Sequence, residues 1–268
     1  MQDAAVRFPI LTRFHPNSDF SIPGKLTIVV TVAATRLSSE ALIVWVSELG
    51  HETQNLLLNG PEGRLEAIFW KPEGNAVPPM AAAVCHPHPL FGGTMHNKVV
   101  YQAAKSLDSL GLAVLRFNFR GTGMSAGTHD RGRGERGDVI AALDFLAKEF
   151  PAKALLVAGF SFGCFVGLRV GCKDDRVAEC IGLGTPVNNT DFSFLRECAK
   201  PKLFVHGELD EFGDVDKVED LVESLPGEKE LVIVPGVDHF FAGKLKEVDA
   251  AITEWMMERH QGLTKTSD

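Results

Sequence analysis

The sequence predicts an α/β fold in which a mostly parallel central sheet is covered by helices on both faces. From about His51 onward, short apolar segments of strand length alternate with amphipathic segments of helical length. The apolar segments are continuous, which is typical of parallel strands buried on both faces. With 268 residues, of which 45% are hydrophobic, the chain is long enough to bury such a core as one domain.

Eight strands are expected in this pattern. Residues 54–60 and 64–72 flank a turn that contains glycine and proline, which predicts a hairpin. The other strands are apolar runs bounded by glycine, proline or polar residues. They are expected at residues 80–86, 112–119, 154–160, 178–184, 201–207 and 229–236.

Helices are expected between the strands, because apolar residues recur there at spacings of three and four. The segment 97–111 begins with Asn97, a good N-cap residue, and ends with Gly111. The other helices are expected at residues 137–150, 161–171, 214–225 and 244–260.

Residues 1–50 do not follow this pattern. They contain Pro9, Pro16 and Pro23 and two apolar runs, but no motif connects them to the rest of the chain. We therefore expect a folded domain at residues 51–262. Residues 1–50 are expected to be an added arm that is disordered, or an over-long start that is not native to the protein.

The charge and the apolar runs exclude some classes of partner. The net charge of −8 leaves no strongly basic face for a nucleic acid. The longest apolar runs, LTIVVTVAA and ALIVWV, are shorter than the roughly 20 residues of a membrane span. The first twenty residues show no secretory signal. A homodimer is compatible with the sequence, which does not determine the oligomeric state.

The five cysteines are odd in number and show no CxxC spacing. Most of them lie in apolar runs, which favours buried free thiols over disulfides or zinc ligands. The sequence therefore predicts a cytoplasmic protein in a reducing compartment.

The segment LLVAGFSFG predicts a nucleophile. Gly159 and Gly163 flank Ser161 in a G-x-S-x-G pattern, which follows an expected strand and begins an expected helix. This strand–turn–helix context, with an acid and a histidine later in the chain, is the signature of the α/β-hydrolase fold. The pattern alone recurs by chance. In this context, Phe162 would direct its backbone N–H at a developing oxyanion.

The acid and the base are expected after later strands. Asp210 in HGELDEFG is the preferred acid, with Glu208 as the alternative. His239 in VDHFF is the expected base, and the adjacent Asp238 is assigned a loop role. A serine needs a histidine to remove its proton and a carboxylate to orient that histidine. The carboxyl ends of parallel strands meet at one edge of the sheet, so the three side chains should converge there.

The stretch HPHPLFGGTMHN is the expected oxyanion loop. Because proline has no N–H, the second donor must be His88 or Leu90, and the sequence does not choose between them. Its three histidines raise the alternative of a metal site. No acid or cysteine ligand is nearby, so no metal is predicted.

Two further segments invite other interpretations. Residues 132–137 match GxGxxG, but they lie too far after their strand for a dinucleotide site. Glu135 and Asp138 are expected to cap the next helix instead. Arg120 is expected to pair with a nearby acid rather than bind substrate. No cofactor is predicted.

Taken together, HPHPLFGGTMHNKVV, RFNFRGTGMSAG, GFSFG, HGELD and VDHFF resemble a small bacterial-type α/β-hydrolase family of esterase or lipase-like serine hydrolases. The resemblance covers about residues 53–260. It implies a serine hydrolase whose catalytic triad is Ser161, Asp210 and His239.

The segment 185–199 is too short for a helical lid domain, so an open cleft lined by Phe91, Phe160 and Phe192 is expected. We expect a serine esterase that acts on a small-molecule acyl substrate through an acyl-enzyme. The alternatives are a peptidase or thioesterase with the same triad, and a non-catalytic binding module on the same fold.

Overall fold

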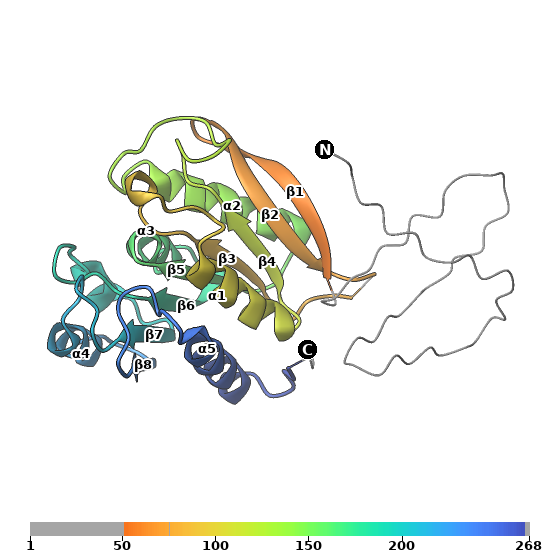
Figure 1. Ribbon diagram of the computed structural model, residues 1–268. Helices are drawn as coiled ribbons and strands as arrows, with labels where there is room; N and C mark the ends of the chain where they lie inside the picture. The colour runs from red at the N-terminus through yellow and green to blue at the C-terminus, as the bar shows by residue number, and fades with distance from the viewer. Residues whose placement is uncertain (1–50, 75, 266–268) are drawn as a thin grey trace, which may run out of the picture. The chain divides into compact units, whose positions relative to one another are not determined.

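The computed structural model describes residues 51–74 and 76–265, which form an α/β domain (Figure 1). The strands are β1 (His51–Gly60), β2 (Gly63–Pro72), β3 (Ala81–Cys85), β4 (Ala113–Phe117), β5 (Leu155–Phe160), β6 (Val177–Leu183), β7 (Lys202–Gly207) and β8 (Lys229–Val234). The α-helices are α1 (Lys98–Ser109), α2 (Glu135–Glu149), α3 (Phe162–Gly171), α4 (Val215–Glu223) and α5 (Leu245–Arg259). The short 3₁₀ helices are η1 (Pro89–Phe91) and η2 (Ser193–Glu197). The predicted arm at residues 1–50 lies outside the described residues, so the division at about residue 50 stays a prediction.

The eight strands form one sheet in the order β1-β2-β4-β3-β5-β6-β7-β8. The hairpin β1–β2 is antiparallel and β2 pairs antiparallel with β4, whereas every pair from β4 to β8 is parallel. The mostly parallel sheet is therefore confirmed. Strands β3, β4, β5 and β7 are buried along their whole length, as their continuous apolar sequences predict.

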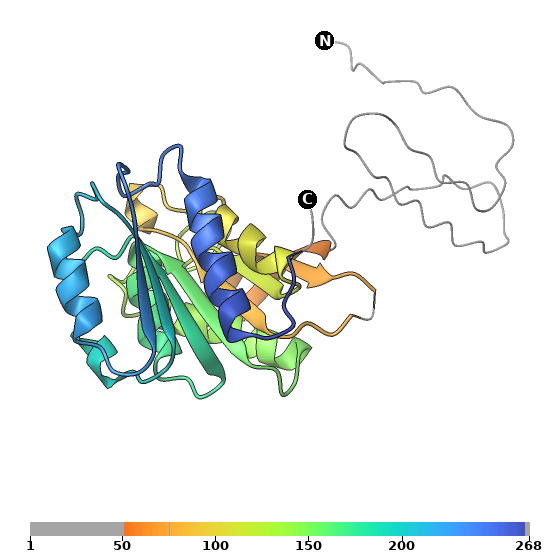
Figure 2. The same ribbon diagram turned by 90° about the horizontal axis from the view of Figure 1, so that it is seen from below.

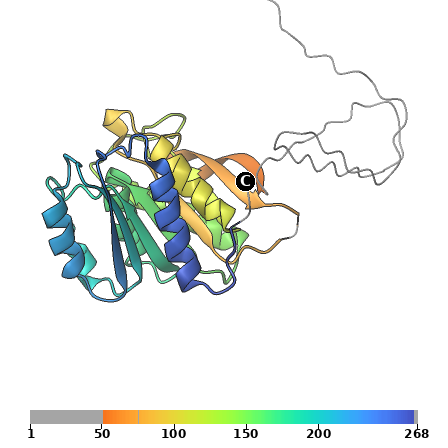
Figure 3. The same ribbon diagram turned by 60° about the horizontal axis from the view of Figure 1, so that its bottom comes forward.

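Helices cover both faces of the sheet. Helices α1 and α5 lie side by side on one face, where their apolar residues form one core cluster with the sheet (Figures 2 and 3). Helices α2, α3 and α4 contribute to the cluster on the other face. Asn97 caps α1 as expected, since its side chain accepts the Val99 N–H at 2.9 Å. None of the helices in the described ranges is long and apolar enough to cross a bilayer.

The connection from β6 to β7 contains only the short helix η2. Residues 184–201 therefore build no helical lid over the sheet edge. The short connection agrees with the prediction that this segment forms no helical lid domain.

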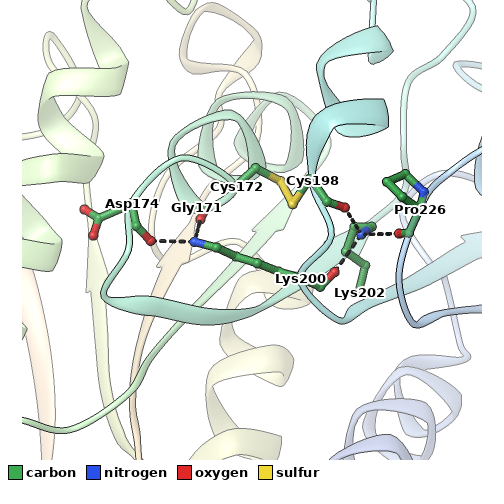
Figure 4. Close-up of a disulfide and its surroundings, with 7 residues drawn as sticks. All are labelled: Gly171, Cys172, Asp174, Cys198, Lys200, Lys202 and Pro226. Carbon is green, nitrogen blue, oxygen red and sulfur yellow. Dashed lines mark hydrogen bonds between the residues drawn. A yellow bond between two sulfur atoms is a disulfide. The ribbon is translucent and has the colours of Figure 1, made fainter.

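The cysteine prediction is wrong at two positions. Cys172, at the end of α3, and Cys198, after η2, form a disulfide with Cα atoms 5.3 Å apart (Figure 4). Cys85, Cys164 and Cys180 are buried free thiols, and burial raises the pKa of each. Spacing along the chain does not reveal that the end of α3 and the segment before β7 meet in space.

Two lysines reinforce the region around this disulfide (Figure 4). The Lys200 ammonium donates to the carbonyl oxygens of Gly171 and Asp174, at the end of α3. The buried Lys202 ammonium donates to three carbonyl oxygens, those of Cys198, Lys200 and Pro226. The carbonyl groups replace the water that each charge loses on burial.

Candidate active site

Ser161 lies in the sharp turn between β5 and α3. Its backbone is strained, with φ 57° and ψ −118°, a conformation that a residue with a side chain seldom adopts. The Ser161 N–H donates to the Leu183 carbonyl at 2.9 Å, which fixes the turn at the end of β6. This is the strand–turn–helix geometry that exposes a nucleophilic hydroxyl.

The two glycines of G-x-S-x-G are required by close backbone contacts. A Cβ on Gly159 would lie 2.2 Å from the Gly163 carbonyl oxygen, across the turn itself. A Cβ on Gly163 would lie 2.3 Å from the Cys85 carbonyl oxygen, at the end of β3. The second contact brings the start of α3 directly against the loop that follows β3.

The start of α3 and that loop provide two candidate oxyanion donors. As the first residue of α3, Phe162 has no helical carbonyl for its N–H. The Leu90 N–H donates to the His88 imidazole at 3.2 Å. In the described part of the chain, by contrast, the His88 N–H has no acceptor. This difference favours His88 over Leu90 as the second donor.

Asp210 and His239 are in direct contact. Asp210 Oδ2 lies 2.7 Å from His239 Nδ1, and both side chains are buried. The second carboxylate oxygen, Oδ1, accepts the Phe212 N–H at 2.8 Å. Both carboxylate oxygens are therefore held, and the imidazole is oriented with Nε2 directed away from Asp210.

The alternative acid, Glu208, does not contact His239. Its carboxylate accepts the Gly236 N–H at 2.7 Å in the loop after β8. Asp238 also has the expected loop role, since its carboxylate accepts the Phe240 N–H at 3.0 Å.

Aromatic rings surround the His239 imidazole. The ring centroids of Phe160, Phe212 and Phe240 lie 4.9, 4.7 and 5.3 Å from that of His239. Phe160 directly precedes Ser161, so its ring links the turn to the imidazole. The Ser161 hydroxyl has no hydrogen bond to His239 or to any other described residue. Such catalytic hydrogen bonds often form only when substrate is bound.

The three phenylalanines expected to line the cleft are not equivalent. Phe91 is 86% exposed and its ring packs against His88. Phe160 and Phe192 are buried in the two core clusters and do not reach solvent. The Phe160 ring packs against His239, and the Phe192 ring packs against Phe165. Their apolar side chains therefore serve the core, not the surface of an open cleft.

Two buried histidines have structural roles that the sequence did not reveal. His86 donates from Nδ1 to the Pro87 carbonyl at 2.7 Å, and its Nε2 accepts the Phe119 N–H at 2.9 Å. Burial lowers the pKa of His86 to about 4. His206 accepts the Thr185 N–H and donates to the Gly213 carbonyl, and burial lowers its pKa too.

The GxGxxG segment forms a loop and the start of α2. Arg120 pairs with the buried Asp138 and with Glu62, which confirms its structural role. Asp138 binds the side chain and the N–H of Arg120, so the expectation that it caps α2 is wrong. Glu135 accepts the N–H groups of Asp130 and Gly132 and thereby fixes the turn before α2. Across the described ranges, no group of three or more His, Cys, Asp or Glu side chains could hold a metal ion.

Comparisons with known proteins agree with this architecture. Residues 84–265 match the family model described as an alpha/beta hydrolase domain. An uncharacterized protein of Rickettsia prowazekii is 39% identical over 211 residues, which cover 75% of this chain and 88% of that protein.

Two solved structures are similar in fold and in sequence. One is a serine hydrolase from Xanthomonas campestris described as having no lid; it is 38% identical with a TM-score of 0.73, covering 80% of this chain and 97% of that one. The other is an alpha-beta serine hydrolase homologue from Coxiella burnetii; it is also 38% identical, with a TM-score of 0.71 over 76% of this chain and 97% of that one.

Proposed function

Because this chain belongs to the alpha/beta hydrolase domain family, we propose that it is a serine hydrolase that cleaves a small acyl ester through an acyl-enzyme. The observation that carries the proposal is the buried 2.7 Å contact of Asp210 with His239, next to the strained turn at Ser161. A Ser-His-Asp triad would need an acid, a base and a nucleophile in this arrangement, whereas a binding module has no need for them.

The proposed reaction begins at Ser161. His239 Nε2 takes the hydroxyl proton while Oγ attacks the carbonyl carbon of the ester. The Phe162 and His88 N–H groups would stabilise the negative charge that develops on the carbonyl oxygen. Asp210 stabilises the imidazolium that forms.

Collapse of this intermediate breaks the bond to the alcohol. His239 returns the proton to the departing oxygen, which leaves the acyl group on Ser161. A water molecule, deprotonated by His239, then attacks the acyl carbon. The bond to Ser161 Oγ breaks, His239 returns the proton to Oγ, and the acid is released. The start of α3 already packs against the loop after β3 in the absence of substrate, and this packing would preorganise both oxyanion donors.

The Ser161→Ala variant tests this proposal. Turnover of 4-nitrophenyl acetate should fall by roughly three orders of magnitude or more. A fluorophosphonate probe should label the wild-type protein at Ser161 and leave the variant unlabelled. Unchanged turnover in the variant would refute the assignment. Matched thioester and aminoacyl amide substrates would separate an esterase from the alternative thioesterase and peptidase.

The cytoplasmic location and the homodimer stay predictions. The Cys172–Cys198 disulfide argues against the predicted reducing compartment, because thiols are kept reduced there. Thiol alkylation of protein taken directly from cells would show whether this pair is oxidised.

A further inference from the structure

A second pair of an imidazole and a carboxylate lies beside the turn at Ser161. The Glu135 carboxylate is fully buried and accepts the N–H groups of Asp130 and Gly132 at 2.7 and 2.8 Å. His129 Nδ1 lies 2.8 Å from Glu135 Oε1, and the His129 side chain is 9% exposed. The proposed reaction uses neither residue.

This pair is held against the proposed oxyanion site. The His129 ring centroid lies 5.4 Å from that of Phe162 and 4.8 Å from that of His88. The Phe162 and His88 rings are themselves 4.9 Å apart. His129 therefore contacts both residues whose N–H groups are the candidate oxyanion donors.

The hydrogen bonding of His129 is incomplete. Nδ1 lies 2.8 Å from Glu135 Oε1, so the Glu135 carboxylate already occupies that side of the ring. Nε2, by contrast, has no partner in the described part of the chain. Nε2 is therefore the ring atom that can bind a ligand, and a nearly buried polar atom without a partner is unfavourable. A polar group of a bound molecule would supply the partner that Nε2 lacks.

The position of His129 indicates which part of a substrate it would meet. In the proposed reaction the alcohol oxygen must lie next to His239, which protonates it. The rings around His239 are Phe160, Phe212 and Phe240, none of which contacts His129. The acyl part is thus the portion that extends toward His129.

The charge near His129 favours an anion. The segment 129–136 carries three arginines and two carboxylates, in a chain with a net charge of −8. Arg131 is exposed, and the described part of the chain offers it no ion-pair partner. A Cβ on Gly132 would lie 3.0 Å from the Phe165 ring, so this loop packs against the helix that begins after Ser161. The positive end of the α3 dipole adds to the attraction.

We infer that His129 determines specificity for acyl esters whose acyl chain ends in a carboxylate, with Arg131 as an accessory positive charge. This inference rests on the proposed function. With Nδ1 facing Glu135, His129 would donate from Nε2 to the distal carboxylate in its imidazolium form, in which both ring nitrogens are donors. The pKa of His88 is lowered mainly by burial and secondly by the charge of the neighbouring His129. This agrees with the close packing of the two imidazole rings.

The test uses the full-length protein and two esters whose acyl chains are equally long when carbon and terminal oxygen atoms are counted together. Mono-4-nitrophenyl adipate carries a distal carboxylate, and 4-nitrophenyl heptanoate is its neutral counterpart. The ratio of their kcat/KM values should fall roughly tenfold in His129→Phe, which keeps the aromatic packing but loses the nitrogen atoms. The same ratio should fall by a smaller factor in Arg131→Gln. High salt screens this charge, so the difference between Arg131→Gln and the wild type should shrink as salt is added. His260→Phe, which alters a partly exposed histidine at the end of α5, should leave the ratio unchanged.

The outcomes separate this inference from the proposed function. If folded wild-type protein hydrolyses neither ester, the proposed function is wrong and this inference falls with it. If both esters are hydrolysed and neither variant changes the ratio, only this inference is overturned. It is also overturned if an acyl chain ending in a neutral amide is cleaved as well as the adipate. Thermal unfolding checks His129→Phe, and Arg131→Gln keeps the test valid if that variant does not fold.

Discussion

Replacing Asp210 with asparagine should remove catalysis without removing the fold. Asparagine has the same shape as aspartate, so its side-chain oxygen can still accept the Phe212 N–H, as Oδ1 does at 2.8 Å. Its amide NH₂ group then faces His239 Nδ1 in place of the carboxylate oxygen at 2.7 Å.

That orientation selects the unproductive tautomer of His239. An NH₂ donor needs an acceptor at Nδ1, which forces the imidazole proton onto Nε2, where it cannot accept the Ser161 proton. The opposite amide orientation places the NH₂ group against the Phe212 N–H, so two donors would face each other, which is unfavourable. The variant also loses the carboxylate that stabilises the imidazolium.

We expect kcat to fall by roughly three to four orders of magnitude in Asp210→Asn, which corresponds to about 4–5 kcal/mol of transition-state stabilisation. Steady-state hydrolysis of 4-nitrophenyl acetate measures the loss, and thermal unfolding verifies the fold. Glu208→Gln is the matched control, because Glu208 accepts only the Gly236 N–H, and its activity should stay within about twofold. Loss of activity in the control, with activity retained in Asp210→Asn, would make Glu208 the acid and refute this reasoning.

Two further predictions concern stability. In oxidised protein, Cys172→Ser should lower the free energy of unfolding by about 3–4 kcal/mol, because the disulfide closes a loop between residues 26 positions apart. Urea unfolding measures this; a reducing agent should lower the wild type to the same value and leave the variant unchanged. For His86, the folded pKa of about 4 lies below the ordinary value of 6.5, so the unfolded chain binds the proton more readily. Stability present above pH 6.5 should therefore be lost as the pH falls toward 4, by about 3 kcal/mol, and His86→Gln should flatten this pH dependence relative to the wild type.

The sheet and helices were predictable because their signals are local. Each buried parallel strand has a continuous apolar run, and Asn97 and Gly111 mark the ends of α1. The candidate nucleophile was predictable for the same reason, since G-x-S-x-G needs only its own strand and helix. The choice of Asp210 over Glu208 was harder, because both follow β7. Only the folded loop shows that Asp210 turns toward His239 and Glu208 toward Gly236.

Features that depend on distant segments were not predictable. The Cys172–Cys198 pair requires the end of α3 to meet the segment before β7, and no periodicity encodes that contact. The burial of Phe160 and Phe192 was not predicted, because the sequence next to a nucleophile or within a loop does not indicate whether a side chain is buried or exposed. The two buried histidines, His86 and His206, satisfy backbone groups of neighbouring loops, so their roles exist only once those loops are packed.

The loop from His129 to Glu135 has a local sequence signal, but its role depends on contacts with a distant segment. Its glycine spacing resembles a dinucleotide motif, yet its distance from the preceding strand excludes that interpretation. In the folded chain Gly132 packs against Phe165, and this contact brings the loop alongside the helix that follows Ser161. In the same region the His129 ring packs against Phe162, and its Nδ1 lies 2.8 Å from the Glu135 carboxylate. The glycines therefore matter for how closely the loop approaches α3, and the proposed selectivity for anionic acyl chains depends on that approach.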